Sequence, residues 1–347
     1  MDINLFDFYL PEELIAQTPA EKRDHSRLLA INKDNHTYED KHFYDIIDYL
    51  NPGDVLVRNN TKVIPARLLG IKEITGAKCE LLLLHQDDEK KDVWECLCKP
   101  AKSIKVGTRI DFGEGKLIAE CIEVKDEGLR KFMFLYEGIF LEVLDQLGKM
   151  PLPPYIKKQL CENERYQTVY AKYEGSAAAP TAGFHFTEEL NEKIKAKGIE
   201  IIEVTLHIGL GTFRPVNVED TKDHVMHSEV YEITEDAARR LNEAKANKRR
   251  IIAVGTTSVR TLEANYSKYG CFKATREATN IFIQPGYEFK AVDSIITNFH
   301  LPKSTLIMLV SSFMGLDFTQ EVYKHAVDSR DLFFSFGDSM FIYAAKR

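Results

Sequence analysis

The stretch GSAAAPTAGFHFTEELNEKIKAKGIEIIEVTLHIGLGTFRPV, residues 175–216, joins a run of small residues to a helix pattern and a strand pattern. Thr187 can cap a helix that Gly198 ends, and the apolar residues that follow predict a strand over 199–209. A helix followed by a strand is typical of α/β proteins, in which ligands bind beyond the ends of the strands. The stretch therefore predicts both a fold class and the place of a site.

The same alternation continues on both sides of this stretch. Further helix patterns cover residues 43–50, 235–248, 258–270 and 304–315, and strand patterns cover 27–32, 54–59, 249–255 and 294–299. A short helix is also expected at 10–17, before Pro19. These patterns predict an α/β, barrel-like main domain.

The pattern changes between residues 67 and 149. Six short β-rich runs, separated by turn residues, cover 66–74, 78–86, 92–99, 109–113, 116–124 and 131–138. Such a series is typical of a small antiparallel barrel. We therefore expect an inserted β-barrel domain at 67–149 within a discontinuous catalytic domain made of 1–66 and 150–347.

Composition narrows the class of protein. The chain has 347 residues, 44% of them hydrophobic and 29% charged, and a formal net charge of −7. No signal peptide or membrane-spanning run is visible, which predicts a cytoplasmic protein with free thiols at its six cysteines. The negative charge argues against wholesale coating of nucleic acid but leaves room for a local basic face. Two clusters could form one: Lys99, Lys102, Lys105 and Arg109, and Lys245, Lys248, Arg249 and Arg250.

Small residues around Gly183 could leave the backbone bare to a ligand, with chemically active side chains close by in sequence. Those side chains are His185, His207, Thr212 and Arg214. The alternative is that the small residues only form turns. The ends of the predicted strands favour a site, because they carry further polar residues that an α/β sheet would bring to one edge. These are Thr256, Thr257, Arg260, His300 and Asp338.

The segment DHVMHSE, residues 223–229, adds His224, His227 and Glu229. Two imidazoles and a carboxylate could ligate a metal, but neutral imidazoles suit acid–base or hydrogen-bonding roles equally well. We expect no metal. No P-loop, dinucleotide-binding fingerprint or G-x-S-x-G elbow is present. GTTSVR, residues 255–260, could offer helix N-terminal amides to a carboxylate or phosphate, or could be an ordinary helix start.

Taken together, several motifs resemble the S-adenosylmethionine:tRNA ribosyltransferase-isomerase family of queuosine biosynthesis. They include FDFYLPEELIAQTP, NPGDVLVRNNTKVIPARL, GSAAAPTAGFHFT, TLHIGLGTFRPV, HSEVYEI, AVGTTSVRTLE, TNFHLPKSTL and FFSFGDSM. The resemblance spans nearly the whole chain and is weakest at about 85–130. Asn60, Ala177 and Phe184 depart from the family, which leads us to expect aspartate, valine and leucine there.

The resemblance implies ribosyl transfer from S-adenosylmethionine to 7-aminomethyl-7-deazaguanine at the wobble position of tRNA with a GUN anticodon. The products would be epoxyqueuosine-tRNA, adenine and methionine, with no cofactor beyond S-adenosylmethionine as co-substrate. The route begins with removal of a proton at C5′ beside the sulfonium; adenine leaves, the amine attacks, and an epoxide closes as methionine departs. The sulfonium charge makes a metal unnecessary. We expect a monomer that binds no membrane.

This reaction gives the candidate residues their expected roles. His185 and His207 are the candidates for proton transfer, and His227, Glu229 and His300 complete the catalytic set. Co-substrate binding falls to seven residues: Gly183, Thr212, Arg214, Thr256, Thr257, Arg260 and Asp338. The inserted barrel is either a clamp for tRNA or a structural lid. Two other functions stay open from sequence: a metal-dependent α/β-barrel hydrolase and a non-catalytic RNA-binding protein.

Overall fold

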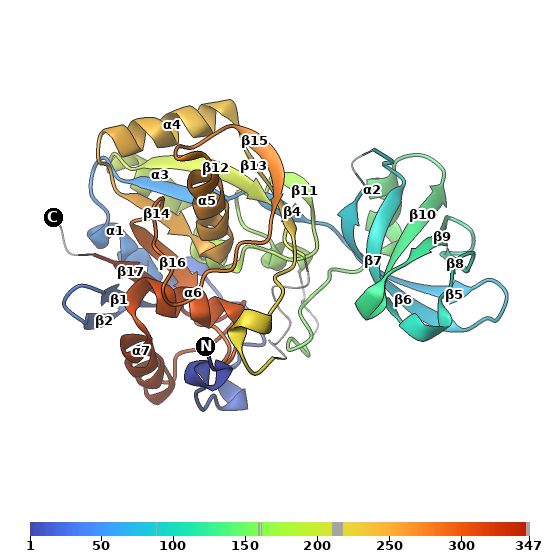
Figure 1. Ribbon diagram of the computed structural model, residues 1–347, viewed down its shortest axis with the longest axis horizontal. Helices are drawn as coiled ribbons and strands as arrows, with labels where there is room; N and C mark the ends of the chain where they lie inside the picture. The colour runs from blue at the N-terminus through green and yellow to red at the C-terminus, as the bar shows by residue number, and fades with distance from the viewer. Residues whose placement is uncertain (88, 159, 161, 210–217, 345–347) are drawn as a thin grey trace. The chain divides into compact units, whose positions relative to one another are not determined.

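The computed structural model describes residues 1–87, 89–158, 160, 162–209 and 218–344 (Figure 1). The chain forms two compact units. The larger unit comprises Met1–Asn60, Pro154–Lys172 and Pro180–Arg347, and the smaller unit comprises Thr61–Pro153 and Tyr173–Ala179.

A nine-stranded sheet forms the centre of the larger unit. Its order is β15 (Thr275–Thr279), β13 (Glu229–Ile233), β12 (Glu200–Leu206), β3 (Val55–Asn59), β14 (Ile251–Val254), β16 (Ser294–Asn298), β17 (Ser339–Tyr343), β1 (Arg27–Asn32) and β2 (Thr37–His42). The four central strands β12, β3, β14 and β16 are parallel, whereas β13 and β17 run antiparallel to their neighbours β12 and β16. Because those four strands are parallel, their carboxyl ends meet at one edge.

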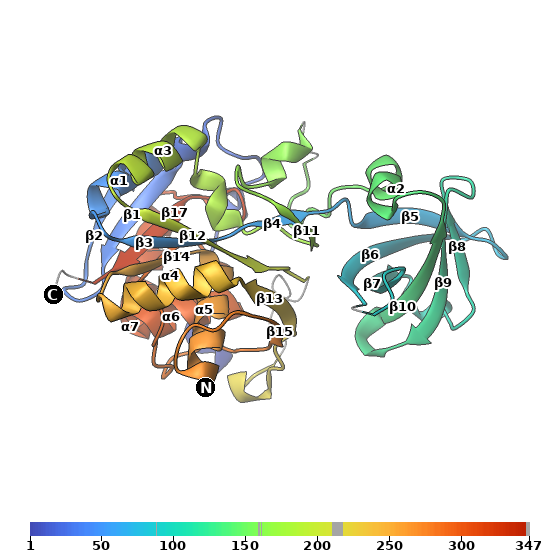
Figure 2. The same ribbon diagram turned by 90° about the horizontal axis from the view of Figure 1, so that it is seen from above.

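Helices cover both faces of this sheet (Figure 2). One face carries α1 (Ile46–Tyr49) and α3 (Glu188–Ala196), and the other carries α4 (Glu235–Ala246), α5 (Gly255–Tyr269), α6 (Thr305–Met314) and α7 (Leu316–Asp328). Thr187 caps α3 as predicted, since its side chain accepts a hydrogen bond from the backbone N–H of Leu190 at 3.0 Å. Gly270 ends α5 in the left-handed conformation, with φ of 71°.

The core between α1, α3 and the sheet is apolar. Leu56 and Ile252 of neighbouring strands pack in one cluster with Ile46 of α1 and with Leu190 and Ile194 of α3. These five side chains are at most 3% exposed, so the sequence pattern that predicted each element also supplies its buried face. No helix in the described part of the chain is long and apolar enough to cross a membrane.

The smaller unit is a closed antiparallel β-barrel with one short helix. The barrel order is β10 (Leu129–Tyr136), β7 (Val93–Lys99), β6 (Lys78–Gln86), β5 (Arg67–Lys72), β8 (Arg109–Phe112) and β9 (Leu117–Val124). Helix α2 (Phe140–Leu147) follows, and β4 (Thr61–Val63) pairs with β11 (Tyr173–Ser176) as a separate two-stranded sheet. The predictions of an α/β class and an antiparallel β-barrel are confirmed.

Three expectations need correction. The larger sheet ends at β15 and β2 in the described residues, so it is open where we expected a barrel-like closure. The boundaries also move: residues 61–66, 150–153 and 173–179 group with the smaller unit, in which β4 and β11 pair. The helix expected at 10–17 is a single 3-10 turn, η2 (Glu12–Leu14), beginning after Pro11.

Other elements carried no clear sequence signal. Strand β2 is polar and mostly exposed along its whole length, so it lacks the alternation of a half-buried strand. Strand β15, TREAT, is also a polar edge strand. Five cysteines, Cys79, Cys96, Cys98, Cys121 and Cys271, are free thiols, as predicted for them; the sixth, Cys161, lies outside the described residues.

Candidate functional site

Polar side chains gather where the parallel strands of the larger unit end. Asn59 is the last residue of β3, Asn298 is the last of β16, and Thr257 lies in the first turn of α5, directly after β14. All three are at most 5% exposed. Their burial at the carboxyl edge agrees with the general position of ligand sites in α/β sheets.

Asn59 connects the end of β3 by hydrogen bonds to the end of β12 and to the start of α5, which follows β14. Its side-chain amide donates to the carbonyl of Leu206 at 2.9 Å and to the hydroxyl of Thr257 at 3.3 Å. Its side-chain oxygen accepts from the backbone N–H of Leu206 at 3.0 Å. The amide therefore fixes the end of β12 and the start of α5 relative to β3.

The neighbouring Asn60 accepts a hydrogen bond from Thr205 at 2.7 Å and donates one to a carboxylate oxygen of Glu203 at 3.2 Å. Glu203 also pairs with Arg58 at 2.7 Å. An aspartate at position 60 would set a second carboxylate beside Glu203. The asparagine, which departs from the family expectation, avoids that repulsion.

Helix α5 begins with the predicted GTTSVR segment. Gly255 has φ of 82°, a left-handed conformation that favours glycine, and an added Cβ would lie 3.5 Å from that of Ala182. Val254 at the N-cap supplies no side-chain hydrogen bond. Thr256 and Thr257 follow Gly255 in the first turn of α5, where they are 8% and 5% exposed.

Arg260, one turn further along α5, forms a buried ion pair with Glu229 at the start of β13. The two side chains are 4% and 2% exposed. Arg260 uses Nη1 for this pair, while its Nε and Nη2 are buried without a hydrogen-bond partner in the described part of the chain. The second carboxylate oxygen of Glu229 accepts from the backbone N–H of Gly209 at 3.0 Å.

Arg260 lines a small pocket that is otherwise mostly apolar. The other lining residues are Met226, Ile281, Phe282, Ile283, Thr305, Leu306 and Leu309. Nε and Nη2 are the two guanidinium nitrogens whose N–H groups run parallel, so together they can bind both oxygens of a carboxylate or phosphate. A buried arginine with this pair unused is the strongest sign of a ligand at the edge.

His185 is fully engaged by its own chain. The hydroxyl of Ser26 lies 2.6 Å from Nδ1, and the side-chain oxygen of Asn298 lies 2.9 Å from Nε2. Because Asn298 donates its amide to the carbonyl of Phe334 at 2.8 Å, its oxygen must accept, and Nε2 therefore carries the proton. Burial lowers the pKa of His185 to about 4, so the imidazole is neutral near pH 7.

His300 is also a buried neutral imidazole. Its Nε2 lies 2.9 Å from the hydroxyl of Thr297, and its backbone N–H donates to the hydroxyl of Tyr323 at 3.1 Å. Burial lowers the pKa of His300 to about 3. In this state the ring can exchange hydrogen bonds with a ligand but is a poor acceptor of a full proton.

The other predicted histidines are less buried. His207, directly after β12, is half-buried, and its backbone N–H donates to the carbonyl of Val230 at 3.1 Å. His227 is also half-buried, and the ring of His224 packs edge-on against Phe282 at 5.4 Å. Burial and the nearby His227 lower the pKa of His224. No group of three or more metal-ligating side chains occurs within the described ranges.

Two residues that we predicted to bind a ligand instead contact other residues of the larger unit. A Cβ on Gly183 would lie 2.1 Å from the hydroxyl of Tyr170, so the protein itself fills the space expected for a ligand. The carboxylate of Asp338 accepts from the backbone N–H groups of Arg27 at 2.7 Å and Leu332 at 2.8 Å. Asp338 therefore holds a turn together, and burial raises its pKa.

The small residues before the site also differ from expectation. Ala177, Ala178 and Ala179 are at most 2% exposed, so they are packed and do not leave the backbone bare. Thr212 and Arg214 lie outside the described residues. Of the predicted set, Arg260 and Glu229 touch directly, and Thr257 joins them in the same sheet edge through α5.

The sequence interpretation passed over Ser26, Asn59 and Asn298. All three are buried and bond to a predicted site residue or to the end of a neighbouring strand. Asn59 and Asn298 could have been found, because each is a polar residue at the end of an apolar strand, in VRN and ITN. Ser26 precedes its strand and gave no comparable signal.

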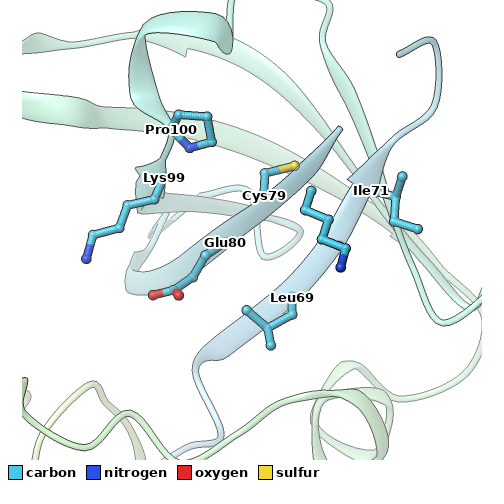
Figure 3. A pocket seen from close by; sticks show the side chains of 8 residues that line it. Leu69, Ile71, Cys79, Glu80, Lys99 and Pro100 are labelled. Atoms are coloured by element: carbon cyan, nitrogen blue, oxygen red, sulfur yellow. The ribbon is translucent and has the colours of Figure 1, made fainter. Parts of the chain in front are cut away.

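The smaller unit has a separate pocket of about 560 Å³ (Figure 3). Leu69 and Ile71 of β5 line it and are 52% and 51% exposed. Figure 3 also shows Lys99 and Glu80 at its rim. Of the predicted basic cluster, Lys99 thus borders the pocket, whereas Arg109 pairs with Glu73 at 3.4 Å.

Comparisons with known proteins agree on one family. The family model described as "queuosine biosynthesis protein" matches residues 3–342. The S-adenosylmethionine:tRNA ribosyltransferase-isomerase of Macrococcus caseolyticus (strain JCSC5402) is 60% identical over 345 residues, which cover 99% of this chain and 100% of the relative. The 2.00 Å crystal structure of an S-adenosylmethionine tRNA ribosyltransferase from Thermotoga maritima is 39% identical with a TM-score of 0.56, over 97% of this chain and 99% of that one.

An open α/β sheet with a polar carboxyl edge and an attached β-barrel define the class as an α/β enzyme with a second β domain. The chain belongs to the queuosine biosynthesis protein family. The predicted family and the prediction of an enzyme are therefore confirmed.

Proposed function

We propose that the chain transfers and isomerises the ribosyl group of S-adenosylmethionine onto 7-aminomethyl-7-deazaguanine at the wobble position of tRNA. The tRNA would carry a GUN anticodon, and the products would be epoxyqueuosine-tRNA, adenine and methionine. The names of both relatives support the donor and the tRNA acceptor. A tRNA substrate also favours a cytoplasmic location.

The open guanidinium of Arg260 is the observation that carries this proposal. Two parallel N–H groups that lack a partner among the described residues, on a side chain that is 4% exposed, suit a carboxylate that arrives with the substrate. Met226, Ile283 and Leu309 line the same pocket, so an apolar chain attached to that carboxylate would contact them once the pocket opens beyond its present volume of about 10 Å³. The methionine part of S-adenosylmethionine has both features.

Glu229 gives Arg260 a fixed orientation. The ion pair occupies Nη1 and the backbone N–H of Gly209 occupies the other carboxylate oxygen, so Glu229 acts on the substrate through Arg260. A ligand carboxylate bound at Nε and Nη2 would not displace Glu229. This arrangement makes Glu229 a positioning residue.

Proton transfer at C5′ fits His207 better than His185. Both ring nitrogens of His185 are occupied by Ser26 and Asn298, which suits a residue that holds loops in place. His207 is half-buried at the end of β12, where a side chain can meet both substrate and solvent. His227 and His300 remain proposals as hydrogen-bonding groups, and Thr256 and Thr257 as polar contacts at the start of α5.

The sulfonium is already a cationic leaving group, so the proposed chemistry needs no metal and no cofactor besides S-adenosylmethionine as co-substrate. We also propose that the enzyme acts as a monomer. Activity should therefore be unchanged by a chelator. Loss of activity with the chelator, and recovery with zinc, would instead favour a metal-dependent hydrolase.

The decisive experiment incubates the protein with S-adenosylmethionine and tRNA that carries the deazaguanine precursor. We expect adenine and methionine to appear in equal amounts as the tRNA gains the ribosyl group. tRNA lacking the precursor is the matched control and should give no adenine. Tight tRNA binding with no adenine release would contradict the proposal and favour a non-catalytic RNA-binding protein.

A further inference from the structure

A second pocket of the larger unit is lined by two arginines, Arg23 and Arg165. Arg23 lies in η3 (Arg23–His25) and Arg165 lies in η7 (Asn163–Tyr166), so two distant segments bring the guanidinium groups to one place. The hydroxyl-bearing Ser26 and Ser335 and the imidazole of His185 complete its polar lining. Neither arginine was among the residues predicted from sequence.

Backbone carbonyls hold both guanidinium groups. Arg23 donates to the carbonyls of Phe184 and Glu164, each at 3.2 Å. Arg165 donates to the carbonyls of Ala20 at 2.5 Å and Glu21 at 3.4 Å. These bonds fix the two groups in place, and the carboxylate of Glu164 acts on Arg23 electrostatically without forming an ion pair with it in the described residues.

No carboxylate lies within 4.0 Å of either guanidinium among the residues that the structure describes, whereas most other half-buried arginines of the larger unit have one. Arg27, Arg240 and Arg249 pair with carboxylates at 2.8, 2.6 and 2.7 Å. The Nε of Arg165 is also buried without a hydrogen-bond partner in the part of the chain that the structure describes. Burial, and next the charge of Arg165, lower the pKa of Arg23.

Two like charges held together without a counter-ion are unfavourable at low dielectric, and an anion bound between them would remove that cost. A phosphate fits best, because its oxygens can accept from two guanidinium groups at once. The hydroxyl of Ser335 can donate one further hydrogen bond when Tyr155 donates to it, whereas the hydroxyl of Ser26 is used by Nδ1 of His185. The two arginines are half-buried, so the pocket can be reached from the surface.

We propose that the pocket between Arg23 and Arg165 binds a phosphate group of a nucleic-acid backbone. The proposal rests on tRNA being the substrate, as set out above. It adds a contact of the larger unit with the tRNA backbone, in a pocket that His185 also lines. A phosphate contact carries no sequence information, so it would position the tRNA without selecting its anticodon.

The test compares the wild-type protein with the double variant Arg23→Gln and Arg165→Gln. Binding of precursor tRNA is measured over a series of salt concentrations, and the Michaelis constant for S-adenosylmethionine is measured at saturating tRNA. Loss of one phosphate contact should weaken tRNA binding about tenfold. It should also reduce the slope of log affinity against log salt by about 0.7, the value for one phosphate of a single strand.

Two further variants separate a local contact from general effects. Arg239→Gln removes a positive charge from α4, where Arg239 is 59% exposed and pairs with Asp236 and Glu243, and it should leave both tRNA affinity and slope unchanged. The double variant with lysine in place of each arginine keeps the charge and should recover most of the slope. Thermal unfolding of every variant shows that the larger unit is folded.

The outcomes are distinct. A weaker tRNA affinity with a smaller slope and an unchanged Michaelis constant for S-adenosylmethionine supports the proposal. An unchanged slope overturns it, and so does a raised Michaelis constant for S-adenosylmethionine alone, which would assign the oxyanion to the small substrate. If the wild-type protein itself neither binds the tRNA nor releases adenine, the proposed function fails first.

Discussion

Each unit of the molecule contains a buried arginine, and the two have opposite surroundings. Arg130 of the barrel is 7% exposed, and all three of its guanidinium nitrogens donate to backbone carbonyls, including those of Ile104 at 3.1 Å and Ala101 at 3.0 Å. Arg260 of the larger unit is 3% exposed, and among the described residues it pairs with Glu229 while its Nε and Nη2 have no hydrogen-bond partner.

The difference teaches how to separate structure from function at buried charges. Arg130 satisfies the loops around it, so its donors are consumed by folding. Arg260 keeps two donors that no residue in the described part of the chain accepts, and an unsatisfied buried donor costs about 1–3 kcal/mol. Such a cost is compatible with a binding site, because a bound ligand would accept hydrogen bonds from both donors.

The largest expected effect is on turnover after Arg260→Met. Removing the open N–H pair should lower kcat/KM for S-adenosylmethionine about 100-fold or more, because a charged, two-pronged interaction is lost. Adenine release at varied S-adenosylmethionine measures this. The variant Arg260→Met with Glu229→Gln removes the unpaired carboxylate as well, and it should be equally inactive. Full activity in either variant would remove Arg260 from the site.

In the barrel, Arg130→Met should lower stability and leave turnover nearly unchanged. This change leaves buried carbonyls without a donor, and we expect the free energy of unfolding of the barrel to fall by about 3 kcal/mol. Trp94, the single tryptophan and 4% exposed in β7, reports this transition by its fluorescence during urea unfolding. Adenine release per folded molecule should stay near the wild-type value.

The matched control is Arg109→Met, on the same barrel. Arg109 is 42% exposed and pairs with Glu73 at 3.4 Å, so its loss should change the free energy of unfolding by less than about 1 kcal/mol. Arg260→Met lies in the other unit and should leave the Trp94 transition unaltered. An equal loss for Arg109→Met and Arg130→Met would break the comparison.

The buried imidazoles of His185 and His300 extend the comparison of buried polar groups to the pH dependence of stability. The pKa of His185 in the folded protein, about 4, and that of His300, about 3, lie below the unfolded value near 6.5. As pH falls, the two histidines are therefore protonated in the unfolded chain before they are protonated in the folded protein. The free energy of unfolding that they contribute above pH 6.5 is lost as pH falls. Between pH 7 and pH 5 each histidine should account for about 2 kcal/mol of that loss.

Urea unfolding followed by circular dichroism at pH 7 and pH 5 measures this loss for the wild-type protein. His185→Gln and His300→Gln should each be less stable at pH 7, but each should lose about 2 kcal/mol less than the wild type on acidification. If both variants lose as much stability as the wild type, the imidazoles are not held neutral by burial.

The sequence predicted those parts of the fold that depend on local periodicity and capping. Thr187 before α3 and Gly270 after α5 are read directly from the chain, and so are the six barrel strands. The open edge at β2 was missed because TYEDKH is exposed on both faces and has no alternation. Sheet closure depends on which strands pair, and that is not a local property.

The candidate site was predictable in part for the same reason. Polar residues after apolar strands led to Thr257 and Arg260, since parallel strands end at a common edge. The Arg23 and Arg165 pocket was missed because its members come from two short 3-10 turns far apart in the chain. A sequence pattern also does not show whether an arginine is paired, which is the property that distinguishes Arg260 from Arg130.

Apart from the control variants, the smallest expected effect concerns Gly183, which is closely packed against other residues of the larger unit. An alanine Cβ would lie 2.1 Å from the hydroxyl of Tyr170 and 2.6 Å from Cγ2 of Thr168, so Gly183→Ala should reduce the free energy of unfolding by about 1–2 kcal/mol. Adding Tyr170→Phe removes the nearest atom and should restore part of this loss, which a double-mutant cycle measures. A raised Michaelis constant for S-adenosylmethionine with unchanged stability would mean instead that Gly183 faces a ligand and belongs with Arg260.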